Sequence, residues 1–131
     1  MFRCELCGRL ADKHHIVHRS DGGVDFPLNI IYLCSEHHRG KDGPHKNRSI
    51  DLQYKIQLKQ KLEIVLKDDF YKIEKLIELL QINRGMMKRI LKELKLYKEG
   101  YRTKDVIYRL MGNEELNQYM MEEYYEFIAN F

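Results

Sequence analysis

All three cysteines and all six histidines of this 131-residue chain lie within one segment, residues 2–47. Two short ligand pairs frame the segment, Cys4-Glu-Leu-Cys7 and Cys34-Ser-Glu-His37, with 26 residues between them. One tight turn can aim two soft ligands with this spacing at a single tetrahedral ion. We therefore predict a structural Zn²⁺ site formed by Cys4, Cys7, Cys34 and His37. The alternative, buried free cysteines beside a surface histidine, does not account for two matched pairs.

The cysteine usage and the hydropathy pattern favour a soluble protein of the cytoplasm. Three cysteines would leave one unpaired in an oxidising compartment, whereas metal-bound thiolates suit a reducing one. No stretch approaches the roughly 20 apolar residues of a membrane span, and the chain begins with the first ligand pair rather than with a leader. We therefore expect a cytoplasmic protein that does not bind a membrane.

The ligand-bearing segment is rich in turns and poor in long apolar periodicity, as is typical of a small metal-stabilised module. Residues 14–19 and 29–33 each have strand character, with residues 20–27 as the turn between them. A short helix is expected from Ser35. The sequence thus predicts strand, strand and helix in residues 1–48, and an α+β protein once the rest of the chain is included.

Residues 49–131 change to the apolar period of helices. The pattern predicts a long helix capped by Ser49, a second helix from Phe70 to Leu80, a third from Arg84 to Leu96 capped by Asn83, a short fourth after Thr103 and a last one from Glu114 to Ile128. We treat residues 1–48 and 49–131 as two regions of the chain.

The net charge of +3 is small but unevenly distributed. Residues 84–104 hold eight basic and two acidic side chains, whereas residues 105–131 hold one basic and six acidic ones. The basic block is a candidate phosphate-binding surface, although a charged helix in solvent explains a short basic run equally well. The acidic, tyrosine-rich end of the chain suits packing or a homodimer contact better than DNA.

Residues 69–96 have the pattern of a helix-turn-helix unit whose second helix would read DNA. Basic side chains recur beside the apolar face of that helix, at Arg84, Lys88, Lys92 and Lys95. A helix in the major groove needs such a strip. Any antiparallel pair of amphipathic helices gives similar spacing, so simple packing or dimerisation is the alternative.

The histidines that zinc does not need form a second polar set. His14 and His15 are adjacent on a predicted strand, so their side chains should point to opposite faces, one to bind a metal and the other to transfer a proton. His38 follows His37 and would point about 100° away from it on a helix, towards the strands. With Asn29 at the loop-to-strand junction, these residues predict a small polar site.

Five motifs follow one another in the ligand-bearing segment: Cys4-x-x-Cys7, His14-His15-Ile16, Gly22-Gly23, Asn29 and Leu33-Cys34-x-x-His37-His38. Their order is similar to that of the HNH nuclease module, the ββα-metal fold of phage nucleases, homing endonucleases and bacterial colicins. The resemblance covers residues 2–47, about a third of the chain. It implies hydrolysis of DNA phosphodiester bonds, by nicking or double-strand cleavage, with one divalent cation (Mg²⁺, Mn²⁺, Ni²⁺ or Zn²⁺), in a bacterial or phage-infected cell.

Within this resemblance, His15 matches the general base, His14 and His38 match ligands of the catalytic metal, and Asn29 matches the residue that holds the active-site loop. A neutral imidazole accepts a proton near pH 7. A metal stabilises charge on the phosphate and on the leaving 3′ oxygen. The alternative function is a regulator that keeps this scaffold and binds nucleic acid or protein without cutting, but such a protein has no use for the full polar set.

The chain departs from the HNH pattern at two positions. Where the family often has proline, this chain has His18, which is a bystander, a phosphate contact or an extra ligand. Where the family commonly has a fourth zinc-binding cysteine, this chain has His37, so His37 and His38 could exchange metals, although the spacing from Cys34 favours His37 for zinc. His45 could complete the shell of the catalytic metal.

Overall fold

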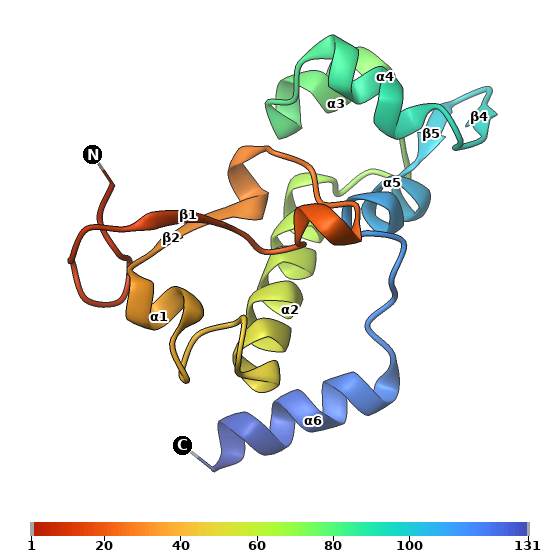
Figure 1. Cartoon of the computed structure of the whole chain (residues 1–131). Helices are drawn as coiled ribbons and strands as arrows, with labels where there is room; N and C mark the ends of the chain where they lie inside the picture. Colours follow the sequence, from red (N-terminus) through yellow and green to blue (C-terminus); the bar gives the residue numbers. More distant parts are fainter. Residues whose placement is uncertain (1, 131) are drawn as a thin grey trace.

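The computed structural model describes residues 2–130 and shows an α+β protein with two small antiparallel sheets (Figure 1). The strands are β1 (Asp12–His15), β2 (Ile30–Leu33), β3 (Phe70–Tyr71), β4 (Leu96–Tyr97) and β5 (Gly100–Arg102). The α-helices are α1 (Ser35–Arg39), α2 (Arg48–Val65), α3 (Ile73–Leu80), α4 (Arg84–Leu91), α5 (Thr103–Leu110) and α6 (Gln118–Ala129). Within residues 2–130, none of the helices has the length and apolarity needed to span a bilayer.

The first sheet is the hairpin of β1 and β2, and α1 follows it directly, so the predicted order of strand, strand and helix is observed. The first strand is shorter than predicted and begins earlier. Residues 16–18 are not part of the strand, because the N–H and the carbonyl of Val17 form hydrogen bonds with the side chain of Asn29 instead of with a neighbouring strand. Two 3₁₀ turns, Arg19–Asp21 and Pro27–Asn29, lie in the connection to β2.

The long helix α2 begins one residue before the predicted cap. Its N-cap is Asn47, whose side-chain oxygen accepts hydrogen bonds from the N–H groups of Ser49 and Ile50. Asparagine is among the strongest N-cap residues because this oxygen satisfies N–H groups that have no partner inside the helix. Ser49 is therefore part of the first turn, and its prediction as the cap is wrong.

The second sheet was not predicted. Phe70 and Tyr71, which were expected to begin a helix, form β3 and pair with β5, and the sheet has the order β3-β5-β4. Helices α3 and α4 lie between β3 and β4 in the chain and pack against each other. Helix α4 ends at Leu91, five residues before its predicted end, and α6 begins at Gln118 instead of Glu114.

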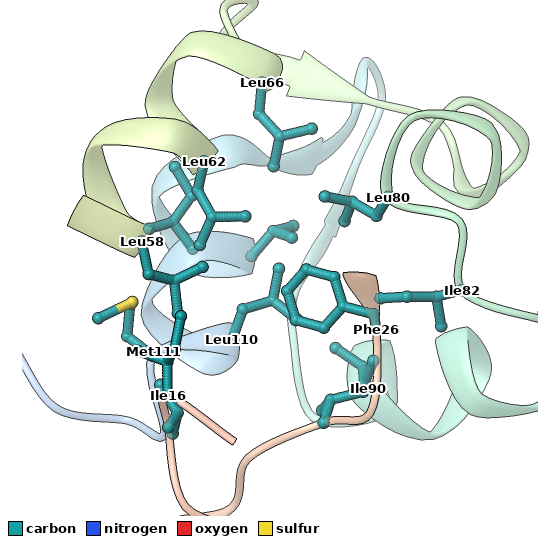
Figure 2. Close-up of a cluster of buried hydrophobic side chains, with 14 of the residues drawn as sticks. Ile16, Phe26, Leu58, Leu62, Leu66, Leu80, Ile82, Ile90, Leu110 and Met111 are labelled. Carbon is teal, nitrogen blue, oxygen red and sulfur yellow. The ribbon is translucent and has the colours of Figure 1, made fainter. Parts of the chain in front are cut away.

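One hydrophobic core joins the two regions of the chain. Phe26, from the connection between β1 and β2, is buried among side chains of the helical region, and Figure 2 shows it near Leu80, Ile82 and Leu110. The loop that follows β1 also packs on the end of α5, where Arg109 donates a hydrogen bond to the carbonyl of Gly22 at 3.0 Å. The orientation of the hairpin relative to the helices is thus set by shared burial.

Candidate functional site

Three cysteines and one histidine converge where the N-terminal turn meets α1, and they are Cys4, Cys7, Cys34 and His37. The Cys34 sulfur lies 3.2 Å from Nδ1 of His37 and 3.6 Å from the Cys7 sulfur, and the Cys4 sulfur lies 3.5 Å from the same nitrogen. Ligands of a tetrahedral ion with bonds of about 2.0–2.3 Å lie roughly 3.3–3.8 Å apart. The group therefore fits a tetrahedral metal such as zinc.

Local turns bring these ligands together. The Cys4 N–H donates to the Arg9 carbonyl and the Gly8 N–H donates to the Cys4 carbonyl, which closes a tight turn around Cys7. Burial opposes ionisation of the Cys4 thiol, but backbone N–H groups, that of Cys34 foremost, outweigh it and lower the pKa of Cys4 to about 6. The thiolate, which is the form that binds metal, is thus favoured near neutral pH.

A second group consists of four histidines whose rings lie face to edge or stacked. The ring centroid of His14 is 4.9 Å from that of His38, 5.0 Å from that of His45 and 5.5 Å from that of His18. His14 and His38 are buried, whereas His45 is exposed, so the cluster opens to solvent at His45. The structure brings together the two predicted ligands and the third candidate, His45, and adds His18 to them. We call these four residues the histidine cluster.

Buried nitrogens of this cluster lack the hydrogen bonds that burial normally requires. Nε2 of His14 and Nδ1 of His38 have no hydrogen-bond partner within residues 2–130. Nε2 of His38 and Nε2 of His45 lie 2.8 Å apart. Adjacent ligands of an octahedral ion with bonds of about 2.1 Å lie roughly 3.0 Å apart. The donor set therefore fits a divalent cation, and ligand atoms of His14, His38 and His45 all lie within 4.8 Å of one another.

The electrostatics at His14, His38 and His45 favour neutral imidazoles. Burial lowers the pKa of His14 to about 3, and the neighbouring His38 and His45 add to the effect. Burial also lowers the pKa of His38 and the pKa of His45 below the ordinary value for histidine. A neutral imidazole has a lone pair for a metal, so these three residues can bind a cation at neutral pH without first losing protons.

His15 follows His14 on β1 and points away from the cluster, as strand alternation predicts. Its Nε2 lies 3.7 Å from Oδ1 of Asp25, and within residues 2–130 its ring makes no ring contact with the histidine cluster. Burial lowers the pKa of His15 while the carboxylate of Asp25 opposes the shift, and the net change is downward. Asp25 was not predicted as a site residue. It lies in the connection between the two strands, and no regular spacing in the sequence indicates which strand residue such a side chain will approach.

Asn29 holds the loop that follows β1. Its side chain is fully buried; the oxygen accepts from the Val17 N–H at 2.8 Å, and the amide donates to the carbonyls of Val17 and Val24 at 3.2 and 2.8 Å. Gly23 allows the same loop to close, because a Cβ there would collide with the Val17 carbonyl oxygen. The loop that carries His18 is thus tied to the start of β2.

The predicted basic strip is only partly on one helix. Arg84 and Lys88 are exposed on α4, but Lys92 is the C-cap that follows the last helical residue, Leu91. Lys95 lies beyond the helix, with its ammonium 4.6 Å from the ring centroid of Tyr97. Asn83 caps α4 as predicted, by accepting from the Met86 N–H. Arg89, which was not predicted as a site residue, is also exposed on α4. In Figure 1, α3 and α4 lie beyond the end of α2 that is remote from α1.

No family model matches the sequence, and neither a curated protein nor a solved structure shows significant similarity to the chain. The function is therefore argued from the residues and the geometry described above.

Proposed function

We propose that this chain is a metal-dependent endonuclease of the HNH, or ββα-metal, type, which hydrolyses phosphodiester bonds of DNA. The observation that carries the proposal is the convergence of His14, His38 and His45 beside a loop held by Asn29. His14 lies on the hairpin, His38 on α1 and His45 in the connection from α1 to α2. A zinc ion held by the three cysteines and His37 would join the N-terminal turn to the start of α1. Apart from His45, these residues belong to the ordered set on which the sequence resemblance rests.

The proposed reaction divides tasks between the two faces of β1. A divalent cation bound by His14 and His38, with His45 at the exposed edge, would stabilise charge on the phosphate and on the departing 3′ oxygen. His15, neutral at pH 7, takes the proton of the attacking water as the bond from phosphorus to the 3′ oxygen breaks. Asp25, 3.7 Å from His15, stabilises the imidazolium that forms.

We assign DNA contact to the exposed face of α4. Arg84 and Lys88 lie on this face, and Arg89 adds a third positively charged side chain. Lys92 and Lys95 would extend this surface towards the β4–β5 hairpin. Helix α4 follows α3 after a short turn and is capped at its start by Asn83, as in a helix-turn-helix whose second helix enters the major groove. These positively charged side chains would bind DNA phosphates and steer the nuclease region to its substrate.

The test is cleavage of supercoiled plasmid by the purified full chain in Mg²⁺, Mn²⁺, Ni²⁺ or Zn²⁺, with zinc content measured on the same sample. His15→Ala should reduce the cleavage rate by roughly 100- to 10,000-fold, because it removes the general base. Its zinc content and circular dichroism should match those of the unaltered protein, which shows that the fold is kept.

Undiminished cleavage by His15→Ala would remove that residue from the mechanism. If the unaltered protein binds DNA tightly but cuts it in none of the four metals, the alternative of a non-cutting regulator is favoured. One active site cuts one strand, so linear product appearing before nicked product would indicate that two copies act together.

A further inference from the structure

A carboxylate from the helical region reaches the histidine cluster. Asp51 lies in the first turn of α2, outside the segment that carries all the cysteines and histidines. Its Oδ1 lies 3.3 Å from Nε2 of His18. Both atoms are buried, and neither has a hydrogen-bond partner among residues 2–130. Two buried polar atoms that face each other without a hydrogen bond call for an explanation.

His18 is placed against the cluster by the loop that Asn29 holds. The ring of His18 stacks on that of His45, with centroids 5.1 Å apart, and lies edge-on to that of His14 at 5.5 Å. The carbonyl of His18 accepts hydrogen bonds from the N–H groups of Asp21 and Gly23, which fixes the backbone at this position. His18 is therefore an ordered member of the cluster.

Asp51 is held with one oxygen free for the cluster. Its Oδ2 lies 3.0 Å from Nζ of Lys55, one helical turn further along α2, and its side chain is only 19% exposed. Lys55 thus occupies one carboxylate oxygen and leaves Oδ1 directed at His18. An aspartate placed only to pair with Lys55 would not need to bury its second oxygen beside imidazoles.

The donor atoms meet around a common residue. Ligand atoms of His14, His18 and Asp51 all lie within 4.8 Å of one another, as do those of His14, His38 and His45, and His14 belongs to both groups. We propose that Asp51 and His18 are ligands of the same cation that His14 and His38 bind, so that α2 completes the metal site of the nuclease region. The role of the metal in catalysis rests on the proposed function, but the inference that these residues bind a metal does not.

The donor chemistry defines the class of cation. Several imidazoles with a single carboxylate suit borderline first-row ions such as Mn²⁺, Co²⁺, Ni²⁺ and Zn²⁺, whereas Mg²⁺ prefers oxygen ligands and keeps several waters. A site with this many protein ligands would hold its cation before DNA arrives. It would also depend on the packing of α2 against the hairpin, since residues 1–47 alone lack the carboxylate.

The test is Co²⁺ titration of the full chain after it has been loaded with one zinc, followed by the visible absorption of the bound cobalt. Zinc content is measured on the same sample, to show that cobalt has not displaced zinc from the cysteines. Asp51→Asn should weaken cobalt binding by roughly tenfold or more and change the absorption spectrum, because a ligand is lost. Asp51→Glu, which keeps a carboxylate, should bind cobalt more tightly than Asp51→Asn.

The matched control is Asp21→Asn. Asp21 also lies beside His18, with its carboxylate 3.8 Å from Nδ1, but its side chain is 57% exposed and it lies outside the ligand groups. The Asp21→Asn variant should bind cobalt with an affinity within about twofold of that of the unaltered protein, since an exposed charge is screened by solvent. If Asp51→Asn binds cobalt as the unaltered protein does, the pair of His18 and Asp51 only ties the loop to α2, and the inference is overturned.

The same titration separates this inference from the proposed function. If the unaltered protein binds no cobalt beyond its zinc, both the further inference and the metal role in the proposed nuclease are contradicted. If cobalt binds to the unaltered protein and to Asp51→Asn alike, only the role of Asp51 fails. Cobalt binding that depends on Asp51 supports the inference whether or not the protein cuts DNA.

Discussion

Replacement of Asn29 by alanine tests most directly how the candidate site is held. The Asn29 side chain makes three hydrogen bonds, one from the Val17 N–H and two to the carbonyls of Val17 and Val24. All three residues are buried, with exposed fractions of 0% for Asn29, 1% for Val17 and 5% for Val24. Asn29→Ala therefore leaves the N–H and the carbonyl of Val17 without the partner that Asn29 supplies, in a place that water reaches poorly, whereas the Val24 carbonyl keeps its hydrogen bond from the Phe26 N–H.

The expected loss of stability follows from these two groups of Val17. Each buried polar group left without its partner costs about 1–3 kcal/mol, and the space left by the amide lets some water enter, so we expect a total of about 2–5 kcal/mol. Whole domains of this size are stable by about 5–15 kcal/mol, so the loss would be a large share. Asn29→Asp keeps the acceptor for the Val17 N–H but turns an oxygen towards two carbonyls, and should be at least as destabilising.

The assay is urea unfolding of the zinc-loaded protein, followed by circular dichroism. The control is Asn83→Ala, which removes one exposed N-cap hydrogen bond, to the Met86 N–H, and should cost about 1 kcal/mol. If Asn29→Ala costs no more than Asn83→Ala, the loop after β1 is held by other contacts, and the reasoning about Asn29 is refuted.

Two further predictions concern the zinc group and α4. Cys34→Ser should bring zinc below one per chain, by elemental analysis, while the helical dichroism stays near that of the unaltered protein because α2 to α5 keep their own core contacts; complete loss of the helical signal would contradict this. Lys88→Gln with Arg89→Gln should weaken DNA binding and lower the slope of log affinity against log salt by about 2. Lys75→Gln, on the exposed face of α3 and paired with Glu78, is the control and should leave the slope unchanged.

Contacts that are local in the sequence were predictable. The spacing of Cys4 with Cys7, and of Cys34 with His37, limits each pair to a single turn, and the structure brings the two pairs together. The alternation of His14 and His15 on opposite faces of β1 also follows from strand geometry alone. These predictions succeed because each depends on backbone geometry over a few residues.

Predictions that depended on distant pairing failed. Phe70 and Tyr71 continue the apolar period of α3, so they read as helix, but they pair with Arg102 and Tyr101, about 30 residues away. A strand of two residues has no periodicity of its own, and its partner decides its structure. The prediction also placed Lys92 and Lys95 on the helix that would contact DNA. The apolar period continues past Leu91, but the chain turns there into β4, so α4 ends before either lysine.

The sequence by itself determined which residues can bind metal and how they are grouped in pairs, because ligand type and short spacing are properties of the chain. Only the tertiary structure decided that His18 and Asp51 join His14, since that meeting depends on how α2 packs against the loop after β1. The packing is set by burial of apolar side chains such as Phe26 in a core that both regions share. Burial of apolar surface is non-directional, so no local pattern of residues specifies which polar side chains it brings together.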